Sequence, residues 1–128
     1  MQKLRRAKSV SKSVSNFIQS NDDGTGVYDM SGKRIGLIER MVIDKRSGRV
    51  VYTVASFGGF PGMGDDTYTI PWNALTYDTQ LAGFTTRITP EKLSGAPAFS
   101  RNADDFWGDY SREEALYTYY GSPYPWAD

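Results

Sequence analysis

The sequence predicts a mainly β protein: a small β-barrel of roughly four to six short strands with a short helical appendage at its C-terminal end. The first observation is a pair of apolar strand signals, 33–44 and 49–57, joined by a polar turn. The second is a series of shorter apolar runs at 68–88, bounded by residues that favour turns. The third is a helix start signal at 111–114, which a Gly and a Pro follow as stop signals.

The first 23 residues are predicted to form a basic, flexible arm outside the barrel. Residues 1–20 carry five cations and no acid, so the rest of this neutral chain has a net charge of −5. The run from Asn21 to Gly24 is a sharp turn signal that separates the arm from the first strand. Because chain ends outside a packed core are mobile, we expect residues 1–20 to become ordered only against a partner.

Residues 24–90 are predicted to form the barrel core, with a long hairpin as its central element. The strand at 33–44 has apolar residues on both faces, so we expect it to be covered on most of its surface or kinked at Gly36. The polar loop after it ends in Gly48, a residue suited to the positive φ that closes a bulged hairpin. The partner strand, 49–57, places alternate residues on opposite faces.

Shorter elements complete the predicted sheet. The segment 58–66 contains four glycines and is predicted to be a loop. A short strand follows at 68–72, in which Pro71 has no N–H group and therefore belongs at a strand end or edge. The sheet continues at 74–78 after a kink, and 81–88 is predicted to be a further strand.

Residues 91–128 are predicted to form a helical and aromatic extension that packs on the barrel. At the junction, the Thr-Pro pair at 89–90 predicts a single helical turn, because Thr is a good N-cap and Pro suits the first helical position. A capping box at 111–114, with Ser as the cap and Glu three residues later, predicts a helix that ends at Tyr120. Gly121 is then well placed for the C′ position.

Several runs of residues, in this order and at this spacing, are typical of one known family. They are 32–38, 42–44, 47–52, 56–60, 62–64 and 70–75, with 93–99 and 119–121 downstream. Through them the chain resembles the PRC-barrel family over roughly residues 24–126, and in particular its bacterial stand-alone branch. The resemblance implies a six-stranded PRC-type β-barrel that serves as an interaction module.

Two known settings of this family do not transfer to the chain. One is the cytoplasmic barrel of the photosynthetic reaction-centre H subunit, and the other is the C-terminal domain of a ribosome maturation factor. The chain shows no membrane span like that of the H subunit, and it has no room for the second domain of the maturation factor. No binding residues are therefore carried over from either protein.

Composition excludes most kinds of catalytic site. The sequence contains no Cys and no His, which rules out thiol and imidazole nucleophile systems and the usual zinc sites. The acid pairs at 22–23 and 65–66 lack calcium-loop spacing. Five acids at 104–114 form a patch, in which Glu113 and Glu114 are explained by helix capping and the helix dipole. The loop at 58–64 lacks the Lys-Ser/Thr ending of a phosphate loop. We therefore expect no enzyme activity, cofactor, metal site or small-molecule substrate.

The function predicted from the residues is binding to a protein partner, including a second copy of the chain in a homodimer. The candidate contact residues are Phe57, Phe60, Met63 and Trp126. Aromatic rings are enriched at interfaces, and Phe and Met side chains beside glycines suit an adaptable contact surface.

The basic arm supports two alternative functions. Its cations are Lys3, Arg5, Arg6, Lys8 and Lys12. They could contact phosphates in an RNA- or ribosome-associated factor, or anionic lipids in a peripheral membrane protein. The mildly acidic remainder of the chain argues against nucleic acid as the main partner. Without a membrane-length apolar stretch or a secretory apolar segment, the expected location is the cytoplasm, with or without peripheral membrane association.

Overall fold

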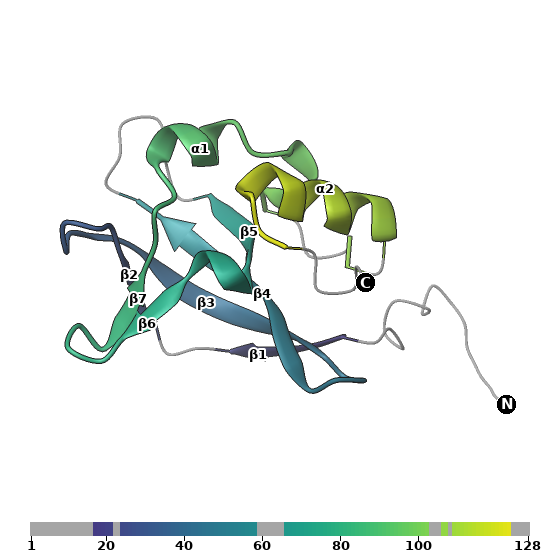
Figure 1. Ribbon diagram of the computed structural model, residues 1–128, viewed down its shortest axis with the longest axis horizontal. Helices are drawn as coiled ribbons and strands as arrows, with labels where there is room; N and C mark the ends of the chain where they lie inside the picture. Colours follow the sequence, from purple (N-terminus) through teal and green to yellow (C-terminus); the bar gives the residue numbers. More distant parts are fainter. Residues whose placement is uncertain (1–16, 22–23, 59–65, 103–105, 108, 124–128) are drawn as a thin grey trace, which may run out of the picture.

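The computed structural model describes residues 17–21, 24–58, 66–102, 106–107 and 109–123 (Figure 1). Within these residues the strands are β1 (Phe17–Asn21), β2 (Gly26–Tyr28), β3 (Arg34–Asp44), β4 (Arg49–Phe57), β5 (Thr67–Pro71), β6 (Thr76–Asp78) and β7 (Gly83–Thr85). The helices are α1 (Pro90–Ser94) and α2 (Tyr110–Tyr120), and the 3-10 turns are η2 (Trp72–Ala74) and η3 (Ala98–Ser100).

All these strands belong to one sheet. Six of them follow in the order β5-β4-β3-β2-β7-β6, and β1 joins β3 outside this path. Only β2 and β7 pair in parallel; the other described pairs are antiparallel. The predicted mainly β, six-stranded fold with a short C-terminal helix is thereby confirmed, and β1 is an additional strand.

The long hairpin of β3 and β4 is the centre of the sheet, and β3 carries a bulge. The pairing shifts between Ile38 and Arg40, so that Ile38 lies opposite Ala55 and Met41 lies opposite Thr53. Ile38 and Met41 therefore share one face although they are three residues apart, which regular strand alternation would not allow. The bulge therefore explains how apolar residues of β3 that do not alternate regularly can still pack against a core.

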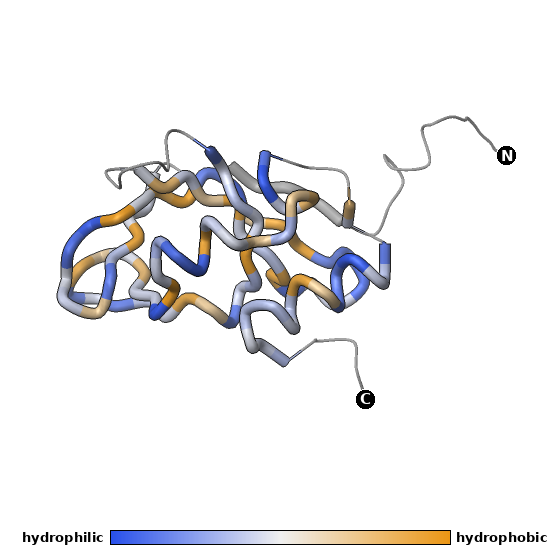
Figure 2. Tube along the Cα trace, turned by 90° about the horizontal axis from the view of Figure 1, so that it is seen from above, coloured by the Kyte–Doolittle hydropathy of each residue, from blue (hydrophilic) through white to orange (hydrophobic). Residues whose placement is uncertain are grey.

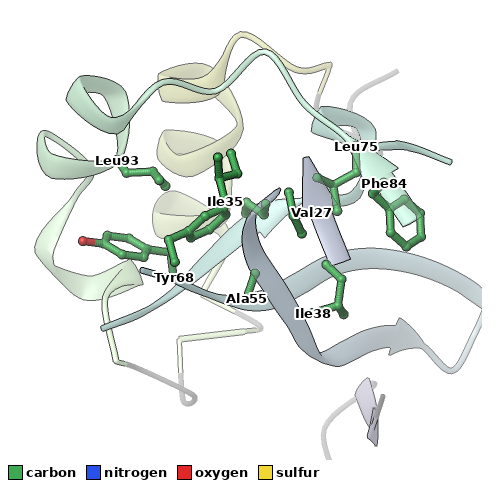
Figure 3. Packing of buried hydrophobic residues seen from close by; sticks show 10 residues of the cluster. Val27, Ile35, Ile38, Ala55, Tyr68, Leu75, Phe84 and Leu93 are labelled. Carbon is green, nitrogen blue, oxygen red and sulfur yellow. The ribbon is translucent and has the colours of Figure 1, made fainter. Parts of the chain in front are cut away.

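Two hydrophobic cores lie on the two sides of β4, so this strand is buried on both faces. The first core fills the space enclosed by the curved sheet and α1 (Figure 3). Its buried members are Val27, Ile35, Ile38, Ala55, Phe57, Tyr68, Ile70, Leu75, Phe84 and Leu93. The second core lies between β4 and α2, and its buried members are Val42, Val51, Tyr52, Val54, Phe106, Trp107, Leu116 and Tyr117. Figure 2 shows hydrophobic segments running through the body and hydrophilic segments at the turns.

Helix α2 is held on the sheet by two tyrosine hydroxyls as well as by apolar packing. The hydroxyl of Tyr52 donates a hydrogen bond to the buried Glu113 carboxylate (2.8 Å), and the hydroxyl of Tyr117 donates to the carbonyl oxygen of Val51. Buried polar groups are costly unless they are paired, so these bonds also determine where α2 sits along β4.

The predicted start of α2 is wrong, whereas its predicted end is confirmed. The N-cap is Asp109, whose carboxylate accepts a hydrogen bond from the Arg112 backbone N–H (3.3 Å), and the predicted cap Ser111 lies inside the helix. Both residue types cap well, and the carboxylate two residues upstream takes the position. At the other end Gly121 has φ +70°, and the Ser122 N–H donates to the Tyr117 carbonyl oxygen in a Schellman-type closure.

The predicted arm contains a strand, which corrects its boundary. Residues 17–21 form β1, whose register runs from Phe17 opposite Asp44 to Asn21 opposite Arg40. The physical reason is the length of β3: its first half pairs with β2, and its second half would otherwise present an open edge.

Three smaller expectations have mixed outcomes. The strand predicted at 81–88 is shorter, Gly83–Thr85, and the strand predicted at 68–72 ends at Pro71, where η2 begins. In its pairing with β4, β3 is irregular only after Ile38, and in its pairing with β2 the register shifts between Arg34 and Gly36, directly beside the predicted kink. Thr89 is the N-cap of α1, as predicted: its hydroxyl accepts from the Lys92 N–H (3.1 Å).

Candidate functional site

A cleft of about 650 Å³ opens where the chain leaves β7, passes into α1 and meets the C-terminal end of α2. Figure 1 shows this end of α2, in yellow, beside the connection that rises from β7 to α1. We call it the Arg87/Lys92 cleft after its two cations. Its other lining residues are Met30, Asn73, Ala74, Thr76, Thr85, Thr86, Ile88, Thr89, Tyr120, Gly121 and Ser122.

One wall of the cleft is built around the buried Thr86. Its hydroxyl donates to the carbonyl oxygen of Ala74 (2.9 Å) and accepts from the N–H of Ile88 (3.2 Å), while its own N–H donates to the carbonyl oxygen of Tyr28 (3.0 Å). These bonds tie the exit of β7 to η2 and to β2. The neighbouring Arg87 is exposed, so its side chain is presented from a backbone fixed on both sides.

The opposite wall is the junction of α1 and α2. The Tyr119 hydroxyl donates to the carbonyl oxygen of Lys92 (2.6 Å), and the ammonium nitrogen of Lys92 lies 4.1 Å from the centroid of the Tyr119 ring. This cation–π contact holds the ammonium group near one place at the edge of the cleft.

The charge of the lining is positive. Arg87 and Lys92 are the two charged residues among the described residues of the lining, and neither forms an ion pair within the described part of the chain. The negative end of the α2 dipole is largely satisfied, because the N–H groups of Gly121 and Ser122 donate to the last carbonyl oxygens of the helix (3.1 and 3.0 Å). On a chain whose residues beyond 20 carry a net charge of −5, the described lining of the cleft is a local region of positive charge.

Tyr120 contributes a neutral wall to the same cleft. Burial, the largest influence, raises the pKa of its hydroxyl far above the ordinary value of 10.0, and the nearby Tyr119 and Tyr68 raise it further against the opposing effect of Arg101. The phenol therefore stays protonated at physiological pH, so Tyr120 is unsuited to act as a base.

Phe57 is not the exposed contact residue that the sequence predicts. Its side chain is 1% exposed and packs edge-to-face on Tyr68 in the first core, with ring centroids 6.0 Å apart. The reason lies across the sheet at Gly36, where an added Cβ would come within 2.8 Å of the Phe57 ring. The missing side chain leaves the space that the ring occupies. Phe57 therefore only borders a second, shallower depression of about 510 Å³.

The other predicted site residues lie outside the described residues. These are Phe60, Met63 and Trp126 among the partner contacts, and Lys3, Arg5, Arg6, Lys8 and Lys12 in the basic arm.

The acids at 104–114 are not gathered into one site where the structure describes them. Glu113 is buried against Tyr52, Asp109 caps α2, and Asp104 and Asp105 are not described. In the described part of the chain, no three acidic side chains are grouped so that they could hold a metal ion. No helix within the described ranges is long and apolar enough to cross a membrane.

Sequence reasoning missed the cleft. Its residues come from η2, β6, β7, α1 and the end of α2, and no local motif joins them. One available signal was the segment 85–89, where three threonines and an arginine connect a strand end to a helix cap.

A family model for the PRC-barrel domain matches residues 18–93, more than half of the chain. The chain belongs to the PRC-barrel domain family. The match begins within β1 and ends within α1, so it covers the sheet of this PRC-barrel and leaves out α2. PRC-barrel domains are in general non-catalytic interaction modules. A search of curated proteins found no match.

Proposed function

We propose that this PRC-barrel protein is a non-enzymatic adaptor that binds a protein partner through the Arg87/Lys92 cleft. The observation that carries the proposal is the combination of a concave opening, hydroxyl groups and two cations without ion partners in the described chain. Met30 adds an apolar contact at the cleft, since its side chain is 57% exposed and Met adapts to irregular surfaces.

The buried acids support a binding role over a catalytic one. Asp44 accepts hydrogen bonds from Ser47 and Arg46 in the β3–β4 turn, and Glu113 accepts one from Tyr52. Neither carboxylate lines the cleft. Both are therefore engaged in holding the fold, and the described residues of the lining include no acid–base pair of the kind that hydrolysis requires.

A second copy of the chain is one candidate partner, and static light scattering on the purified protein would measure this self-association. We place the encounter with the partner in the cytoplasm.

The test is quantitative affinity capture from native lysate with matched charge reversals. One bait carries Arg87→Glu and Lys92→Glu in the cleft, and the control bait carries Lys45→Glu and Arg49→Glu at the far end of the hairpin. All four side chains are on exposed residues, so the folds should be alike by circular dichroism.

We expect the cleft variant to lose the proteins that the wild type captures and the control variant to keep them. Equal capture by both variants would place the binding surface elsewhere. A substrate turned over by the purified protein would contradict the adaptor role.

A further inference from the structure

We infer that the segment entering the Arg87/Lys92 cleft is an acidic peptide in an extended conformation. This inference rests on the proposed function and specifies the chemistry of the partner. The observations that carry it are the placement of the two cations and the strand edge at which the cleft begins.

The cations come from two different elements and face one opening. Arg87 follows β7, where the hydrogen bonds of Thr86 fix the backbone, and Lys92 lies on α1 with its ammonium group against the ring of Tyr119. An Arg guanidinium can bind a carboxylate through two parallel hydrogen bonds, and a Lys ammonium acts as a point charge. One acidic side chain of the peptide would therefore bind Arg87 and a second would bind Lys92. The two contacts would fix the position of the peptide along the cleft as well as attract it.

The extended conformation follows from the sheet. β6 is the last strand in the sheet order and pairs only with β7 among the described residues. Its other edge therefore has backbone groups that no described strand pairs with. Thr76, the first residue of β6, lines the cleft. An extended peptide can add to such an edge through backbone hydrogen bonds while its side chains enter the adjoining cleft.

A peptide fits this surface better than a nucleic acid does. Sequence-independent binding to nucleic acid commonly uses about six to ten phosphate contacts, whereas the described lining of the cleft offers two cations. Among the described residues, Tyr120 is the one aromatic side chain that lines the cleft, and it is half-buried, so these residues offer no exposed ring for base stacking.

The experiment is selection from a displayed random decapeptide library on the full-length wild-type protein. Selections on the Arg87→Glu/Lys92→Glu and Lys45→Glu/Arg49→Glu variants run in parallel. The selected peptide that binds best is then synthesised and titrated by fluorescence polarisation at low and high salt. A version with Lys in place of its acids, and a single-stranded RNA of matched length, serve as further probes.

We expect wild-type selections to be enriched in Asp and Glu, and the chosen peptide to bind the cleft variant at least about tenfold more weakly, with little change for the control variant. Its affinity should fall as salt rises, because the contacts are between charges at the surface. The Lys-containing version should bind the cleft variant better than it binds the wild type.

Each alternative result overturns a different statement. Selected peptides that depend on the cleft but carry no excess of acids would overturn the acidic class and leave the proposed cleft function intact. Acidic peptides that bind wild type and cleft variant equally, or a library without binders, would overturn the cleft as a peptide site. RNA that binds more tightly than any peptide, and only when Arg87 and Lys92 are present, would make nucleic acid the partner class.

Discussion

Gly36 is the residue at which β3 and β4 come closest to conflict. A Cβ added there would meet the Ser56 carbonyl oxygen and would lie 2.8 Å from the Phe57 ring. Neither neighbour can move freely, because one is backbone in a sheet and the other is fully packed in the first core. The glycine is therefore required by close approach, and no positive φ is involved.

We expect Gly36→Ala to lower the free energy of unfolding by about 1–3 kcal/mol through overpacking. Thermal or urea unfolding followed by circular dichroism measures the change. Thr79→Ala, an exposed change in the β6–β7 turn, is the control and should have little effect. An unchanged midpoint for Gly36→Ala would mean that β3 and β4 are further apart than the structure indicates.

Asp44 makes the stability of the hairpin depend on pH. Burial is the largest single influence and raises the pKa of its carboxyl. The hydrogen bonds from Ser47 and Arg46 lower this pKa, and together they outweigh burial, so it lies below the ordinary 3.8. A carboxyl whose pKa is lower in the folded state stabilises the fold above the unfolded pKa. That contribution is lost as the pH falls through the folded pKa.

We therefore expect wild type and Asp44→Asn to differ by a constant free energy of unfolding above about pH 5, and the difference to shrink below pH 3.8. Urea unfolding at a series of pH values measures it. Thr79→Ala, an exposed change that removes no titratable group, is the control, and its difference from wild type should not depend on pH. Parallel pH profiles for wild type and Asp44→Asn would contradict the prediction.

At the scale of elements, the sequence around α2 offers two residues that could begin the helix. The capping box places the helix start at Ser111, and the structure places it at Asp109. Both positions hold a good capping residue, so propensity does not decide between them. The structure decides through backbone hydrogen bonds at Asp109, whose carboxylate accepts from the Arg112 N–H and whose carbonyl oxygen accepts from the Glu113 N–H.

A pair of alanine substitutions distinguishes the two starts. We expect Asp109→Ala to cost about 1 kcal/mol of stability, because it removes the acceptor for the Arg112 N–H. Ser111→Ala, inside the first turn, should change the stability by no more than about 0.5 kcal/mol. The reverse order of effects in urea unfolding would show that Ser111 is the cap in solution.

For the whole molecule, β1 decides how much of the N-terminal region belongs to the domain. Its pairing covers the half of β3 that β2 does not reach. A chain that begins at residue 17 keeps this pairing, and a chain that begins at residue 22 loses it and leaves a β3 edge open. Open edges are sites of intermolecular pairing.

We expect the chain that begins at residue 22 to unfold at least about 5 °C below the one that begins at residue 17, and to form larger species. Differential scanning calorimetry and light scattering measure the two effects. Equal melting temperatures and equal sizes would mean that β1 adds nothing to the fold.

Much of the fold could be predicted from local patterns. Two runs rich in apolar residues, joined by the polar turn at Gly48, predicted β3 and β4, and the Thr-Pro pair predicted α1. These features are local: a turn residue or a cap acts within about four positions of itself. The order and spacing of such pieces were enough to indicate the PRC-barrel family.

What needed the tertiary structure were the choices made between distant segments. The burial of Phe57 depends on Gly36 across the sheet. β1 pairs with the part of β3 that extends beyond β2. The cleft is lined by residues as far apart in the sequence as Met30 and Ser122. Sequence alone fixes which residues are apolar, charged or able to turn. Which of them meet depends on strand register and helix docking, and these are set by packing energies summed over the whole molecule.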